Sequence, residues 1–127
     1  MNKNMKKILI VDDQAPMVKI LSDILKKENY QISIAANGQL GIKKALEINP
    51  DLIIMDIMMP VKNGIDAIRE LRELDNFKKT PIIVLTAKGG LNDYQSAMDS
   101  GASSFMAKPF SPGEIVEEVK KLLTNSG

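Results

Sequence analysis

The hydrophobic and polar positions of this chain alternate between two kinds of segment. Residues 8–11, 52–55 and 82–85 are apolar at every position, which is typical of strands buried on both faces of a parallel sheet. Residues 31–35 alternate between apolar and polar side chains, which predicts a strand nearer an edge, and residues 103–107 predict a weaker fifth strand. The pattern therefore predicts a sheet of five strands.

Segments of helical period separate these strands. Apolar positions three and four residues apart predict helices over 17–25, 65–74 and 115–123, and shorter patterns predict helices over 38–47 and 91–100. Strand and helix thus alternate five times along the chain. This order predicts an α/β domain with a doubly wound parallel sheet and right-handed crossovers.

Composition sets limits on the class of protein. The chain has 127 residues, which predicts a single domain over 1–127, structured from about residue 5 to about 124. Apolar residues make up 44% and charged residues 26%, and no apolar segment is long enough to span a membrane. We therefore expect a soluble cytoplasmic protein that does not bind membranes.

The charge and the missing residue types exclude several kinds of site. The net charge is +1 and the lysine pairs are scattered, which does not indicate a nucleic-acid surface. The chain has no cysteine, so disulfides and thiolate metal sites are excluded. It also has no histidine, so the usual general base and phosphohistidine are absent. A G-x-G-x-x-G turn, the mark of a dinucleotide-binding domain, does not follow the first strand.

Polar side chains stand where four of the predicted strands end. Asp12 and Asp13 follow the first strand, Asp56 follows the third, Thr86 ends the fourth and Lys108 follows the fifth. The carboxyl ends of parallel strands share one edge of a sheet, and doubly wound sheets bind their ligands there. We therefore expect three acids, one hydroxyl and one amine to converge.

Each of these residues also has a purely structural interpretation. Asp12 or Asp13 could cap the helix that follows, because aspartate is favoured at that position. Thr86 could be an ordinary strand residue and Lys108 an ordinary surface lysine. Asp56 fits a structural role least well, because an apolar segment precedes it and no helix begins directly after it.

The expected cluster has a defined chemistry. Three carboxylates close together raise at least one pKa unless a cation joins them. Oxygen ligands without cysteine or histidine favour Mg²⁺ or Mn²⁺ over Zn²⁺. Lys108 adds a positive charge and Thr86 a neutral donor. Such a site suits phosphoryl transfer, with Asp56 as the candidate nucleophile.

Four motifs in this order resemble one family. They are "ILIVDDQ", "PDLIIMDIMMPVKNG", "PIIVLTA" and "GASSFMAKPF". Together they resemble the response-regulator receiver domain, the phosphoacceptor module of bacterial two-component signalling, over nearly the whole chain. The resemblance implies a flavodoxin-like (βα)5 fold with strand order 2-1-3-4-5.

The resemblance also implies a role for each residue of the cluster. It implies that Asp56 is the phosphorylated residue and that Lys108 contacts the phosphoryl group. It implies further that Asp12 and Asp13 hold Mg²⁺ together with Asp56 and the backbone carbonyl of Met58. On this interpretation the domain is not an enzyme, except that it catalyses its own phosphorylation and dephosphorylation.

A switching mechanism and a special peptide bond follow from the same resemblance. Thr86 is expected to hydrogen-bond the phosphoryl group, and Phe105 to turn into the space that Thr86 leaves. The two changes would alter the surface made by the fourth helix, the fifth strand and the fifth helix. A plain core aromatic is the alternative for Phe105. The Lys108–Pro109 peptide bond is expected to be cis.

Two departures from common family variants add expectations. Met58 offers no polar group that could position an attacking water, so we expect slow self-dephosphorylation unless Lys88 compensates. Ser103 and Ser104 stand where receivers of winged-helix transcription factors usually carry an acidic pair. The charge-paired dimer of those receivers is therefore not implied, and a phosphorylation-dependent dimer of another kind stays open.

The expected partners are proteins. A histidine kinase or phosphotransfer protein would donate the phosphoryl group, because the chain has no histidine of its own. The output would be a downstream protein or an effector domain, and the sequence does not decide whether the chain stands alone. We expect no direct nucleic-acid binding. The alternative function is a receiver-like interaction module that is never phosphorylated.

Overall fold

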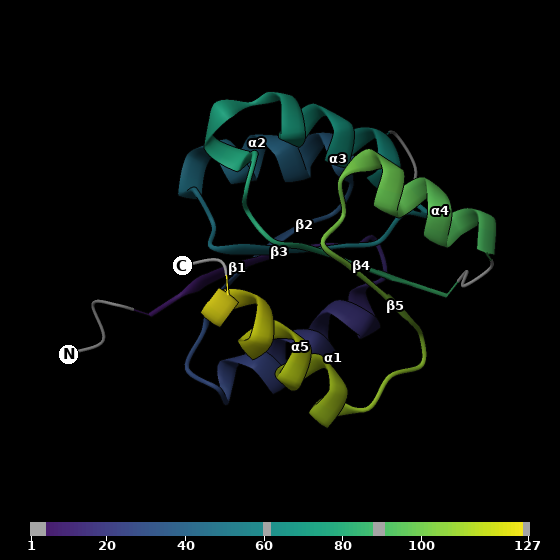
Figure 1. Ribbon diagram of the computed structural model, residues 1–127. Coiled ribbons are helices and arrows are strands. Elements are labelled where there is room, and N and C mark those ends of the chain that lie inside the picture. Colours follow the sequence, from purple (N-terminus) through teal and green to yellow (C-terminus); the bar gives the residue numbers. More distant parts are fainter. Residues whose placement is uncertain (1–4, 60–61, 88–90, 126–127) are drawn as a thin grey trace.

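Five parallel strands form one sheet with helices on both faces (Figure 1). The computed structural model describes residues 5–59, 62–87 and 91–125. Lys88, on which the expectation about self-dephosphorylation partly rests, lies outside these ranges. The elements follow one another as β1 (Lys7–Val11), α1 (Ala15–Lys26), β2 (Gln31–Ala35), α2 (Gly38–Ile48), β3 (Leu52–Met55), α3 (Gly64–Glu73), the 3-10 turn η1 (Asp75–Phe77), β4 (Ile82–Thr86), α4 (Leu91–Ser100), β5 (Ser104–Ala107) and α5 (Pro112–Asn125).

The strand order is β2-β1-β3-β4-β5, as the resemblance implied. The three fully apolar segments became β1, β3 and β4, which occupy the middle of the sheet and are almost wholly buried. The alternating segment became β2 at one edge, where its residues are only partly covered. The predicted fold class is confirmed. The fully apolar segments became central strands because helices cover both of their faces, whereas the alternating segment became an edge strand.

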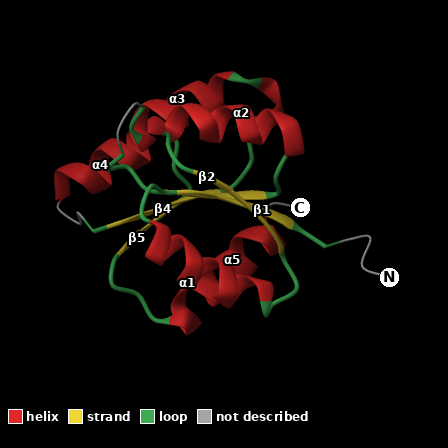
Figure 2. Ribbon diagram, turned by 180° about the vertical axis from the view of Figure 1, so that it is seen from behind, coloured by secondary structure: helices red, strands yellow, loops and turns green. Residues whose placement is uncertain are grey.

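Two apolar layers hold the helices to the sheet. Figure 2 shows α1 and α5 on one face and α2, α3 and α4 on the other. Successive residues of a strand point to opposite faces, so Leu9 and Val11 belong to the layer under α2 and α3. Ile8 and Ile10 belong to the layer under α1 and α5. The sheet is therefore fixed from both sides, and its strand ends are held in place.

Local sequence signals set several helix ends. Pro16 lies in the first turn of α1, where its missing N–H removes no helical hydrogen bond. The side chains of Asn37 and Asn63 accept backbone N–H groups at the starts of α2 and α3. Gly101 follows α4 with φ +118°, a conformation that favours glycine. These signals fix where α1, α2 and α3 begin and where α4 ends, and so fix the lengths of the loops between helices and strands.

A partly buried arginine, Arg72, ties α3 to the loops at the amino-terminal edge of the sheet. The Arg72 guanidinium donates to the backbone carbonyls of Gly101, Phe77 and Thr80 at 2.9, 2.6 and 2.7 Å. It also lies 3.4 Å from Oγ of Ser103. Burial lowers the pKa of the Arg72 guanidinium, yet the ordinary pKa of arginine is so high that the group stays charged. We call this residue with its four acceptors the Arg72 clamp.

Within the described ranges, no helix combines the length and the apolar character that a membrane crossing requires.

Candidate functional site

The first two acids lie at the carboxyl end of β1 and differ in exposure. Asp12 is buried, and its backbone N–H donates to the carbonyl of Ala35 at 3.1 Å. Asp13 is exposed. Neither residue caps α1, because the position before that helix is Gln14, which has no side-chain capping bond. Asp12 Oδ1 instead accepts the backbone N–H of Gln14 at 2.9 Å, which orients its carboxylate.

Asp56 follows β3 in a buried position. Its backbone N–H donates to the carbonyl of Val11 at 3.0 Å, which joins the ends of β1 and β3. Its side-chain Oδ1 accepts the backbone N–H of Met58 at 3.1 Å. The Met58 side chain itself is 55% exposed. Asp56 is thus desolvated on the protein side and held with a fixed orientation.

Lys108, which follows the edge strand β5, brings a positive charge to the acids. Its side chain is 7% exposed, and its Nζ lies 3.0 Å from Asp12 Oδ2 and 3.6 Å from Asp56 Oδ2. The backbone N–H of Lys108 donates to the carbonyl of Thr86 at 2.8 Å. The Lys108–Pro109 peptide bond is cis, so that expectation is confirmed. The ammonium group therefore bridges the two buried carboxylates.

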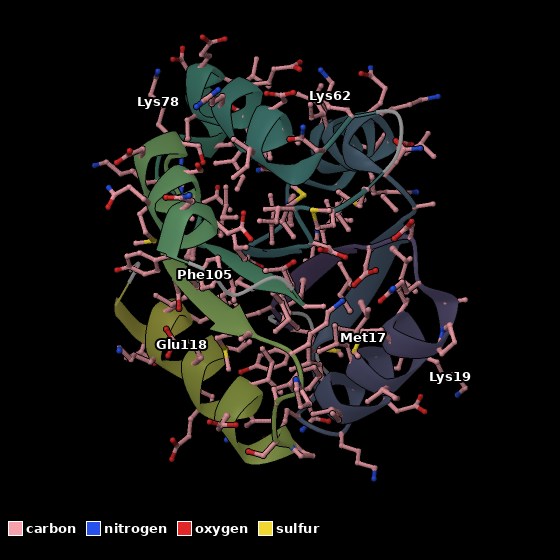
Figure 3. All side chains as sticks on the ribbon, turned by 90° about the vertical axis from the view of Figure 1, so that its right-hand side faces the viewer. Met17, Lys19, Lys62, Lys78, Phe105 and Glu118 are labelled. Atoms are coloured by element: carbon pink, nitrogen blue, oxygen red, sulfur yellow. The ribbon has the colours of Figure 1, made fainter. Side chains whose placement is uncertain are left out.

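Thr86 and Phe105 lie on neighbouring strands that pair in parallel. Thr86 ends β4 and is fully buried, and its side chain forms a hydrogen bond with Asp56. Phe105 lies on β5 between α4 and α5 (Figure 3) and packs against the layer under α2, α3 and α4. The Tyr94 ring on α4 meets the Phe105 ring edge to face, with centroids 5.6 Å apart. Phe105 is therefore only half-buried, and α4 covers it in part.

The electrostatic balance at Asp56 favours its protonated form relative to an aspartate in water. Desolvation by burial is the largest effect and raises the pKa of Asp56. The N–H of Met58, the charge of Lys108 and the hydrogen bond from Thr86 lower it, and the charge of Asp12 raises it again. The net result is a pKa above the ordinary value of 3.8. The carboxylate at this position is incompletely compensated by the protein alone.

The three acids fit a divalent cation. Asp12, Asp13 and Asp56 each offer one carboxylate oxygen, and these oxygens lie within 4.8 Å of one another. Because Asp13 is exposed, the cluster is open to solvent on one side. Carboxylate oxygens with room for water are the coordination that Mg²⁺ prefers. The donor set and the raised pKa of Asp56 are both consistent with such an ion.

The residues that the sequence predicted to converge do lie together, and one neighbour of theirs was not predicted. Asp12, Asp13, Asp56, Thr86 and Lys108 meet at the carboxyl edge, as their strand positions predicted. The side chain of Gln14 was not anticipated, yet its Oε1 lies 3.4 Å from Lys108 Nζ. A glutamine directly after an acidic pair does not by itself indicate a lysine partner, so only the fold could reveal this contact.

Comparison with known proteins identifies the family of this arrangement. Residues 8–120 match the family described as the response regulator receiver domain. This chain belongs to that family. Among curated proteins, the receiver is 47% identical over 120 residues to the transcriptional regulatory protein ResD of Bacillus subtilis. The match covers 94% of this chain but only 49% of ResD, so the receiver spans about half the length of that relative.

Two further relatives match over nearly their whole length. The chemotaxis protein CheY of Thermotoga maritima is 42% identical over 118 residues, which cover 92% of this receiver and 97% of that protein. Among solved structures, the receiver domain of the sensor histidine kinase PA1611 of Pseudomonas aeruginosa has a TM-score of 0.89 at 28% identity. That comparison covers 94% of this chain and 98% of the other, which has a magnesium ion in its active-site cleft.

Proposed function

We propose that this receiver takes a phosphoryl group onto Asp56 in a two-component phosphorelay. The observation that supports this most is the pairing of one buried, incompletely compensated carboxylate with a buried ammonium group 3.6 Å away. Both groups lie beside two further acids that fit Mg²⁺. A structural ion pair would need only one acid for Lys108, whereas three acids beside one lysine leave net negative charge. That excess charge is what a cation and a transferred phosphoryl group would require.

The transfer step assigns one role to each side chain. A carboxylate oxygen of Asp56 attacks the phosphorus of a phosphohistidine. The P–N bond then breaks, and its electron pair leaves with the histidine nitrogen. Lys108 donates hydrogen bonds to the phosphoryl oxygens, and the Met58 N–H, which already binds Asp56, keeps the attacking carboxylate oriented.

Mg²⁺ would be held by Asp12, Asp13, Asp56 and the backbone carbonyl of Met58. When bound, it supplies positive charge against the carboxylates and the phosphoryl oxygens. Mn²⁺ would suit the same oxygen ligands. The buried Asp12 and the exposed Asp13 differ in what they contribute, because the former also accepts a hydrogen bond from Lys108 at 3.0 Å. Asp13 is exposed, so its carboxylate can meet a hydrated ion.

Phosphorylation would change the output surface through two residues. The Thr86 side chain, which hydrogen-bonds Asp56, would hydrogen-bond a phosphoryl oxygen. Hydrogen bonds to charged groups contribute about 1.5–3 kcal/mol, enough to shift two conformations by roughly ten- to a hundredfold. Phe105 would then turn inward and lose its edge contact with Tyr94. The surface of α4, β5 and α5 would carry this change to a partner.

The relatives suggest two kinds of output. The receiver corresponds to nearly all of a chemotaxis protein and to half of a transcriptional regulatory protein. The output is therefore either a separate protein that reads the α4–β5–α5 surface or a further domain of a longer regulator. The phosphoryl donor is a histidine kinase or a phosphotransfer protein, because the chain has no histidine.

The test is the intact mass of the protein after incubation with a small acyl phosphate, with and without Mg²⁺. We expect one added phosphoryl group in the presence of Mg²⁺ and none after Asp56→Asn. Asp23→Asn is the matched control, because it removes an exposed carboxylate on α1 and leaves the cluster intact. Its mass should rise as in the parent protein.

An unmodified parent would contradict the proposal. If circular dichroism showed the parent to be folded and no phosphoryl group were added at any Mg²⁺ concentration, the site would be inactive. The alternative, a receiver-like module that acts through protein contacts without phosphorylation, would then take its place.

A further inference from the structure

The Lys108 ammonium has three oxygen atoms around it, and one of them belongs to a neutral side chain. Nζ lies 3.0 Å from Asp12 Oδ2, 3.4 Å from Gln14 Oε1 and 3.6 Å from Asp56 Oδ2. An ammonium group has three donors, so these three acceptors match its capacity. Gln14 is thus part of the environment of Lys108, although the sequence analysis gave it no role in the site.

The three acceptors differ in what happens to them when the site is loaded. Asp12 and Asp56 are both in the acid cluster that fits a divalent cation. An ion there competes with Lys108 for the oxygens of Asp12, and phosphorylation converts the carboxylate of Asp56 into an acyl phosphate. Gln14 is uncharged, so it has little affinity for the ion and keeps its oxygen available to Lys108. The backbone of Gln14 is fixed meanwhile by its N–H bond to Asp12 at 2.9 Å.

The local structure explains why this glutamine is available. Gln14 occupies the position before α1, where a side chain often accepts a helix N–H group. Its side chain makes no such capping bond. It lies instead against the lysine that follows β5, 94 residues further along the chain. The helix start is stabilised by Pro16 in its first turn and does not require the glutamine.

We propose that Gln14 is a positioning residue for Lys108. Its side-chain carbonyl keeps the ammonium group directed toward Asp56 when the carboxylate of Asp12 is engaged by a cation. This inference rests on the proposed phosphorylation of Asp56. It adds a residue whose effect passes entirely through Lys108, with no contact to the cation.

The central test compares Gln14→Met, which keeps the length of the side chain and removes its oxygen, with the parent. At saturating Mg²⁺ and acyl phosphate, we expect the maximal phosphorylation rate to fall by about two- to tenfold, the equivalent of one net hydrogen bond. The Mg²⁺ dissociation constant, measured by calorimetric titration without a phosphoryl donor, should be unchanged. Gln39→Met on α2 is the matched control, an exposed glutamine outside the cluster, and should match the parent in both measurements.

A double-mutant cycle separates positioning from a structural role. In a Lys108→Ala background, the same Gln14→Met substitution should change the rate by less than about twofold, because its target is gone. Equal slowing in both backgrounds would overturn the inference, and so would a Gln14→Met rate equal to that of the parent. A weakened affinity for Mg²⁺ in Gln14→Met would also overturn it, since it would place the glutamine among the metal ligands.

The same experiment distinguishes failure of the inference from failure of the proposed function. A parent that takes up no phosphoryl group overturns both. A parent that is phosphorylated normally, beside an equally fast Gln14→Met variant, overturns the role of Gln14 alone. Gln14→Ala provides a second variant, and because the side chain is exposed, neither change removes a core contact.

Discussion

The buried side chain of Lys108 and the partly buried side chain of Arg72 are both cationic, and they lie in opposite surroundings. The Arg72 clamp, at the amino-terminal edge of the sheet, meets three backbone carbonyls and one hydroxyl oxygen, all neutral. Lys108, at the carboxyl edge, meets two carboxylates and lies close to the third acid of the cluster. The Arg72 clamp surrounds its positive charge with neutral hydrogen-bond acceptors, whereas the lysine site has more negative than positive groups.

This difference separates stability from function within one small domain. Arg72 donates hydrogen bonds to backbone carbonyls that would otherwise lack a donor, so it stabilises the fold. Its hydrogen-bond acceptors are neutral and do not attract a cation. A cation that shares crowded acids leaves one of them with a raised pKa, as at Asp56. The two regions should therefore respond in opposite directions when a charge is removed.

The largest effect is expected at the clamp. Arg72→Ala leaves the carbonyls of Gly101, Phe77 and Thr80 without their donor, and we expect a loss of about 2–4 kcal/mol in the free energy of unfolding. Urea unfolding measures this loss. Arg69→Ala on the same helix is the control, because the Arg69 side chain is 60% exposed, and it should change stability by less than about 0.5 kcal/mol. Equal losses of unfolding free energy in Arg72→Ala and Arg69→Ala would contradict the stabilising role of the Arg72 clamp.

A smaller effect of the opposite sign is expected at the lysine site. Asp56→Asn keeps an oxygen for the Met58 N–H and removes a carboxylate whose charged form is disfavoured. Without Mg²⁺, we expect the free energy of unfolding to rise, because the substitution removes a charged form that burial disfavours. Asp23→Asn, which loses an exposed pair with Lys19, should give no gain. A destabilised Asp56→Asn protein in the presence of a chelator would contradict this view of the site.

The smallest effect concerns pH. The folded-state pKa of Asp56 lies above its ordinary value of 3.8, so between these two values the folded state binds more protons than the unfolded state. The contribution of Asp56 to stability is therefore fully present below the ordinary value and is lost as the pH rises through the raised folded-state pKa. Urea unfolding of the parent and of Asp56→Asn at a series of pH values, with chelator present, isolates this change. A difference between the two proteins that does not vary with pH would show that Asp56 has an ordinary pKa.

The local patterns of the sequence carried most of the fold. A strand that is apolar at every position, such as residues 52–55, exposes apolar side chains to water unless both of its faces are buried. These segments therefore predicted central strands, and the third of them placed Asp56 at a strand end. The convergence of Asp12, Asp56 and Lys108 followed from the parallel order alone, because that order puts all the carboxyl ends at one edge.

The contacts of the long polar side chains could not be read in this way. Arg72 looks like an ordinary helix residue and Gln14 like an ordinary loop residue. Their partners lie in segments that only the tertiary structure brings near. Capping preference also misled, since Asp12 and Asp13 were plausible caps for α1, whereas Gln14 precedes that helix. A side chain with several rotatable bonds and a polar tip has many local options, and packing decides among them.

The ion pair between Asp12 and Lys108 joins residues 96 positions apart in the sequence. Such a contact requires closure of almost the whole chain, an entropic cost that non-local contacts return only when the intervening elements are in place. During synthesis, the acids of β1 and β3 leave the ribosome long before the lysine that follows β5. A nascent or partly folded chain can therefore display the acids without their cation. The assembled site marks a chain whose folding is complete.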